Sequence, residues 1–142
     1  MQKINCYDEN GNTIQHLVQW DKNQVIYADN FVSGTTPSIH YAMPEHFEES
    51  RSYGNTVTNS NNKLSIKIPN ELLTKHGRLY VYLYYSTTTK YVIELTVKSK
   101  PQPSEYVYED NVDYISVSQL ETRITNLTNR VTTLENKIKS IA

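Results

Sequence analysis

The fold is decided by the stretch Leu79-Tyr80-Val81-Tyr82-Leu83-Tyr84-Tyr85. Its apolar and tyrosine residues alternate with a period of two, which places successive side chains on opposite faces of a β-strand. One face is then formed by Leu79, Val81, Leu83 and Tyr85. After a short polar turn, a second strand is predicted with an inward face of Tyr91, Ile93, Leu95 and Val97. The two stretches predict a pair of strands that covers one core.

The rest of residues 1–100 has the pattern of further short strands separated by polar turns. Asn10-Gly11 is the strongest hairpin signal because both residues accept positive φ. Asn59-Ser60-Asn61-Asn62 marks a second hairpin, Pro69 to Leu73 a helical turn between sheets, and Glu45 to Tyr53 an irregular segment. Roughly seven or eight strands, about ten residues apart, predict a mainly β fold with an immunoglobulin-like β-sandwich over residues 1–100.

The composition excludes several classes of protein. The net charge of -1 argues against a nucleic-acid-binding arm, and no apolar run has the length of a membrane span. The first residues lack the apolar region of a signal peptide. The single cysteine, Cys6, excludes an internal disulfide framework and is expected to be a half-buried apolar residue. We therefore expect synthesis in a reducing cytoplasm.

Two further segments are predicted after the sandwich. Pro101-Gln102-Pro103 ends the sheet pattern because proline cannot continue a β-ladder. Residues 101–115, rich in proline and tyrosine, are expected to form an extended arm that packs on its own or a neighbouring sandwich. A helix is expected to begin near Ser116 or Ser118, either of which can cap it.

Residues 116–142 carry a seven-residue apolar repeat. Its members are Val117, Leu120, Ile124, Leu127, Val131, Leu134, Ile138 and Ile141. Their alternating spacing of three and four places all of them on one stripe of a slightly under-wound helix. A lone helix would expose this stripe to water, so the repeat predicts a parallel coiled coil. The alternative is an amphipathic helix that folds back on its own sandwich.

The residues beside the stripe bear on the number of chains. β-Branched residues at the a positions with leucine at d favour two strands in simple coiled coils. In a parallel bundle, however, Arg130 at a g position meets Glu135 at the e position of the next chain. The segment from Arg130 to Glu135 resembles a short trimerisation signature. In that signature the aliphatic part of the arginine side chain covers the core, and its guanidinium pairs with the glutamate of a neighbouring chain. We predict a homotrimer, with a dimer as the alternative.

The stretch from Trp20 to Tyr114 resembles a known family. The likeness is carried by Gln19-Trp20-Asp21-Lys22-Asn23-Gln24, Ile39-His40-Tyr41, Ile68-Pro69-Asn70-Glu71-Leu72-Leu73 and Lys100-Pro101-Gln102-Pro103-Ser104-Glu105-Tyr106-Val107-Tyr108. These segments are similar to the N-terminal domain of tailed-bacteriophage structural proteins, including baseplate upper proteins and related fibre-type proteins. The resemblance implies a small β-sandwich that attaches to the virion, followed by a coiled-coil stalk. It leaves open a head fibre, a tail or a baseplate position.

No constellation of catalytic or metal-binding residues is found in the sequence. The four histidines, His16, His40, His46 and His76, lack the close spacing of a zinc site, and no second cysteine is present. Neither a glycine-rich phosphate loop nor a Gly-x-Ser-x-Gly elbow occurs. We therefore expect no enzyme activity, no catalytic residues, no metal and no cofactor.

The outward face of the first strand is the candidate binding surface. It carries Tyr80, Tyr82 and Tyr84, and tyrosines on one face could stack on sugars or dock another protein. The alternative is that the second sheet or the arm covers them. Trp20, at a strand end, is expected to lie in the core.

Together these features predict a non-enzymatic virion protein. We expect a trimeric fibre or adaptor, made in the bacterial cytoplasm, whose partners are capsid or tail proteins and not nucleic acid. The alternative is a carbohydrate-binding module displayed on a trimeric stalk for adhesion to a host surface.

Overall fold

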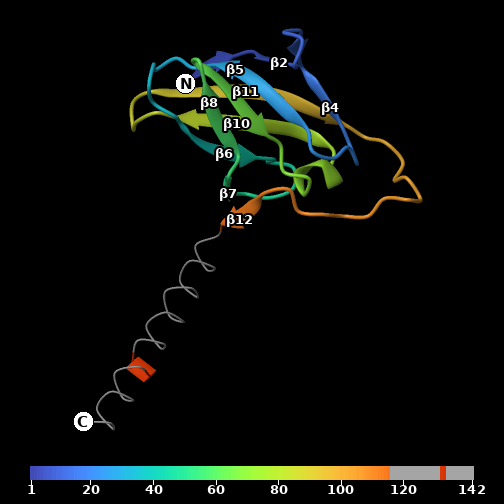
Figure 1. Cartoon of the computed structure of the whole chain (residues 1–142). Coiled ribbons are helices and arrows are strands. Elements are labelled where there is room, and N and C mark those ends of the chain that lie inside the picture. The colour runs from blue at the N-terminus through green and yellow to red at the C-terminus, as the bar shows by residue number, and fades with distance from the viewer. Residues whose placement is uncertain (116–131, 134–142) are drawn as a thin grey trace.

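A computed structural model describes residues 1–115 and 132–133 of the chain (Figure 1). Its described residues form two β-sheets and one 3-10 helix, η1 (Leu72–Thr74). The predicted mainly β fold is confirmed. The predicted coiled coil lies outside the described residues except for Thr132 and Thr133, and it stays a prediction.

One sheet has seven strands. The order is β1-β11-β10-β6-β7-β12, and β4 also pairs with β11. These strands are β1 (Gln2–Ile4), β4 (His16–Val18), β6 (Ser38–Ala42), β7 (Arg51–Gly54), β10 (Gly77–Tyr84), β11 (Lys90–Lys98) and β12 (Asp113–Ile115). The long antiparallel pair β10–β11 is the one that the alternating tyrosine stretch predicts, and it lies at the centre of the sheet.

The other sheet has five strands in the order β3-β2-β5-β9-β8. They are β2 (Cys6–Tyr7), β3 (Thr13–Ile14), β5 (Val25–Asp29), β8 (Val57–Ser60) and β9 (Lys63–Lys67). Both hairpins predicted from asparagine-containing turns are present. Asn61 and Asn62 have positive φ values of 51° and 61°, as a two-residue turn between twisted strands requires.

In the first hairpin, the backbone conformation of the turn differs from the predicted one. Gly11 has a positive φ of 82°, whereas Asn10 is not among the residues with positive φ. The backbone N–H groups of Asn10 and Asn12 instead donate to Oδ1 of Asp8, each at 2.9 Å. The carboxylate of Asp8 therefore closes the turn, in the manner of an Asx turn.

The N-terminal segment passes between the two sheets. β1 and β4 belong to the seven-stranded sheet, while β2 and β3 between them belong to the other. β1 pairs in parallel with residues 91–93 of β11, and β4 pairs in parallel with residues 96–98. Glu94 and Leu95 of β11 lie between these two pairings, so the edge of the sheet is interrupted there.

The core lies between the sheets, and the alternation predicted for β10 is confirmed. Leu79, Val81 and Leu83 are fully buried, as are Leu72 and Leu73 of η1. Tyr41 on β6 is also fully buried, and its hydroxyl donates to the carbonyl of Lys67 at 2.6 Å. This hydrogen bond joins the two sheets. Cys6 is 1% exposed, so it is buried and not half-buried as predicted.

Two strands occur where none was predicted. β7 lies partly in the stretch expected to be irregular, and it pairs with β6 and with β12. β12 lies in the predicted arm and forms the outer edge of the sheet (Figure 1). Each strand is short, with three or four residues, so neither presents a periodic signal.

The arm lies on the sandwich of its own chain. Trp20 is half-buried and not a core residue, contrary to the prediction, because its indole N–H donates to the carbonyl of Lys100 at 2.8 Å. Its ring packs edge-on against Tyr106, with the ring centroids 5.1 Å apart. Lys22 Nζ lies 4.9 Å from the centroid of the same tyrosine.

No helix among the described residues is long and apolar enough to cross a membrane.

Candidate functional site

Tyr80, Tyr82 and Tyr84, here called the tyrosine row, lie on the outer face of β10. The Tyr80 and Tyr82 centroids are 6.3 Å apart with an interplanar angle of 21°, and those of Tyr82 and Tyr84 are 6.2 Å apart at 41°. His40 of β6 packs edge-on against Tyr84 with centroids 4.9 Å apart. Lys90 Nζ lies 5.5 Å from the centroid of Tyr84. These contacts form one continuous aromatic surface.

The strand register supports the centre of this surface. Tyr82 lies opposite His40 on β6 and opposite Val92 on β11. Val92 is only 8% exposed although it points away from the main core. Its burial therefore comes from side chains of the outer face. Burial, followed by the neighbouring Tyr84, Tyr80 and Glu94, raises the pKa of Tyr82.

The tyrosine row is not covered by the rest of the sandwich. All three side chains are half-buried, and they lie on the face opposite the core. The arm contacts Trp20, Lys22 and Asn70 instead. Within residues 1–115, neither the second sheet nor the arm covers the row, and binding by it stays a prediction.

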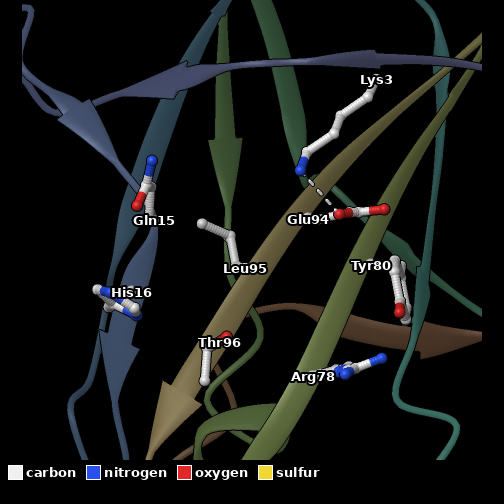
Figure 2. Close-up of a pocket in the computed structure, with 8 residues that line it drawn as sticks. All are labelled: Lys3, Gln15, His16, Arg78, Tyr80, Glu94, Leu95 and Thr96. Atoms are coloured by element: carbon white, nitrogen blue, oxygen red, sulfur yellow. Dashed lines mark ion pairs between the residues drawn. The ribbon is translucent and has the colours of Figure 1, made fainter.

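A depression of about 500 Å³ adjoins the row at Tyr80 (Figure 2). It lies over the interruption between β1 and β4, and residues of β1, β4, β10 and β11 line it. Figure 2 shows Lys3 and Glu94 at one side, where Nζ and Oε2 form an ion pair of 2.9 Å. Gln15 and His16 face them across the depression from the segment that begins β4.

The charges around the depression do not balance. Lys3 and Glu94 neutralise each other, and their pairing is weak because both side chains are exposed. In the part of the chain that the structure describes, Arg78 and His16 form no ion pair. The depression therefore offers an unpaired guanidinium, further hydrogen-bonding groups and the Tyr80 ring to a bound molecule. This arrangement can hold a ligand.

Sequence reasoning found the tyrosine row but missed the depression. The lining residues come from two distant parts of the chain, the N-terminal segment and the β10–β11 pair. The hollow exists because the N-terminal segment leaves the sheet edge between β1 and β4. No sequence pattern reports this interruption. The predicted oligomerisation residues between Val117 and Ile141 lie outside the described residues, and their role stays a prediction.

Two of the histidines, thirty residues apart in the sequence, lie close together. The rings of His46 and His76 have centroids 6.2 Å apart, and His46 Nε2 lies 2.5 Å from the carbonyl oxygen of His76. Among residues 1–115 and 132–133, no three histidine, cysteine or acidic residues gather in a group that could hold a metal ion. The contact between His46 and His76 joins the loop after β6 to the residue before β10.

Comparison of the chain with protein-family models, with curated proteins and with solved structures finds no match.

Proposed function

We propose that this chain is a non-enzymatic structural protein of a bacteriophage virion. Residues 116–142 would form a parallel coiled coil that joins three copies. The immunoglobulin-like sandwich of each copy would attach to the capsid, tail or baseplate. The observation that carries the proposal is the position of the heptad repeat, which begins at Val117, two residues after β12 ends at Ile115.

The sandwich supports this role by fixing the chain just before the repeat. β12 pairs with β7 over three residues, and Asn70 donates a side-chain hydrogen bond to the carbonyl of Glu109 at 2.9 Å. The repeat therefore starts from an edge strand of the folded sheet and not from a free linker. In a bundle, this attachment would hold each sandwich close to the bundle axis.

The mechanism that we propose is avidity. Most helical stability in proteins comes from the packing of an apolar face, so the coiled coil and the sandwiches would stabilise each other in the assembly. Three weak contacts made together hold far more tightly than one, because the second and third form at a high effective concentration. The tyrosine row is the candidate surface for these contacts, since aromatic residues are enriched at protein interfaces.

A second candidate function is a carbohydrate-binding module on the same trimeric stalk. The depression beside Tyr80 favours it, because a hollow lined by polar side chains next to an aromatic ring suits a sugar better than a flat protein surface.

The virion role can be tested by labelling. Antibodies against residues 1–115 would be applied to virions purified from cells that encode this chain, and the labelled particles viewed by electron microscopy. We expect label on the head, the tail or the baseplate. Particles that contain no trace of the chain, by labelling and by mass spectrometry, would contradict the proposal.

A further inference from the structure

We propose that the depression beside Tyr80 binds an anionic sugar residue, one that carries a carboxylate or a phosphate. The inference deepens the second candidate function and rests on it for its biological role. The binding itself needs only the sandwich, because every residue that lines the depression lies in residues 3–96.

The shape of the depression is built into the fold. A continuous edge strand beside β11 would cover Glu94 and Leu95, but β1 ends at Ile4 and β4 begins at His16. The far wall is fixed, since the backbone N–H of Thr96 donates to the carbonyl of Gln15 at 3.0 Å. A hollow held by backbone pairing on both sides is preorganised, which lowers the entropic cost of binding.

The charge of the depression selects an anion. Lys3 and Arg78 supply two positive charges against the single negative charge of Glu94. A guanidinium presents parallel N–H groups that match the two oxygens of a carboxylate or phosphate, and such charge-assisted bonds are stronger than neutral ones. Arg78 is the group that would hold the anion, because Lys3 is already paired with Glu94.

The remaining groups suit a sugar. Gln15, His16 and Thr96 offer donors and acceptors for ring hydroxyls. Tyr80 supplies an apolar ring face. The near-parallel ring of Tyr82 lies next to it, with the ring centroids 6.3 Å apart. Aromatic rings of this kind bury apolar surface while their hydroxyls stay free for hydrogen bonds.

The size and polarity argue against a protein partner at this place. A volume of about 500 Å³ lies within the range of small-ligand sites. The centres of protein interfaces are depleted in charged residues, whereas the depression has charged side chains on three of its strands. A protein is better accommodated on the tyrosine row.

The test is calorimetric titration of the full chain with three probes. They are a tetrasaccharide of alternating glucuronic acid and N-acetylglucosamine, glucose 6-phosphate, and neutral maltotetraose. We expect at least one anionic probe to bind at least about tenfold more tightly than the neutral one, and the probe that binds distinguishes carboxylate from phosphate. Equal affinity for all three, or no binding at about 10 mM, would overturn the proposal.

Substitutions locate the binding. We expect Arg78→Gln to weaken anionic binding at least about fivefold and Tyr80→Ala to remove most of it. The matched control is Lys98→Gln, an exposed cation farther along β11. It should bind like the unchanged chain. An equal loss in Lys98→Gln would mean unspecific attraction to surface charge and would contradict the site.

The same samples separate this inference from the proposed virion role. Light scattering on each sample reports the number of chains. Trimers that bind no anionic sugar would overturn the site alone, while monomers that bind it would overturn the trimer alone.

Discussion

The side chain of Asn111 pairs with the backbone around Asn70 as a neighbouring strand would. Its Oδ1 accepts a hydrogen bond from the backbone N–H of Asn70 at 2.7 Å, and its Nδ2 donates to the carbonyl of Ile68 at 3.0 Å. Asn70 is 2% exposed and uses its own side chain in the same way, accepting from the backbone N–H of Asn23 at 2.8 Å and donating to Glu109. Two asparagines thus bind the arm to the sandwich.

Replacing Asn70 should therefore destabilise the whole domain. Asn70→Ala removes two side-chain hydrogen bonds, the one accepted from the backbone N–H of Asn23 and the one donated to the carbonyl of Glu109. A hydrogen bond of this kind contributes about 0.5–1.5 kcal/mol, so we expect a loss of about 1–3 kcal/mol in the free energy of unfolding. Urea unfolding measures it. Gln102→Ala, at an exposed arm position, is the control and should change stability by less than about 0.5 kcal/mol.

Gly77 is required by the backbone at the start of β10. Its φ is +126°, and a Cβ there would collide with the carboxylate of Glu45. We expect Gly77→Ala to lower the free energy of unfolding by about 1–3 kcal/mol, since L-residues rarely adopt this conformation. The double variant Gly77→Ala with Glu45→Ala removes the collision and should recover only part of the loss. Full recovery would show that the carboxylate, and not the backbone, sets the requirement.

Gly34 provides the comparison for Gly77. It also has a positive φ, +76°, but its Cβ position is open. Gly34→Ala should cost about 1 kcal/mol, the typical penalty of the left-handed region. A larger loss there than at Gly77 would contradict the account.

The buried thiol of Cys6 should make stability fall at alkaline pH. Burial raises the pKa of Cys6 from 9.0 to about 11. The thiol therefore ionises first in the unfolded chain, and its contribution is intact below about pH 8 and is lost as pH rises from about 9 to about 11. The shift corresponds to at most about 3 kcal/mol. Urea unfolding at several pH values should show a shallower decline in Cys6→Ala than in the unchanged chain. Identical declines would contradict the assignment.

The predicted arginine–glutamate contact should strengthen the trimer. Arg130 and Glu135 are expected to pair between neighbouring helices, so Arg130→Ala should raise the concentration at which the oligomer dissociates. Sedimentation equilibrium across a dilution series measures this concentration. Asn136→Ala changes an outward position of the repeat and is the matched control. The same dissociation in both variants would count against the pairing.

Long-range contacts decide which parts of the fold the sequence could predict. β10 and β11 are eight and nine residues long and alternate over most of their length, so their pairing and their inward faces were predictable. β7 has Tyr53 as its one buried residue, and its partner β12 comes about sixty residues later, so neither strand has a local signal. Trp20, at a strand end, was expected in the core, but its indole N–H needed a partner, which the arm supplies.

The candidate site also has one part that the sequence predicts and one part that it does not. The tyrosine row follows from alternation within one strand, so its members could be named from the sequence. The depression depends on where the N-terminal segment leaves the sheet, and only the structure brings Lys3, His16 and Arg78 around it.

We propose that residues 116–142 hold three sandwiches together. The most direct measurement is the mass in solution by light scattering, for the full chain, for a chain ending at Ile115, and for the full-length variant Leu127→Asp. Ending at Ile115 retains β12 and its pairing with β7. The account predicts three times the chain mass of 16.5 kDa for the full chain and a monomer for both variants. A full-length chain that is monomeric at micromolar concentration would contradict it.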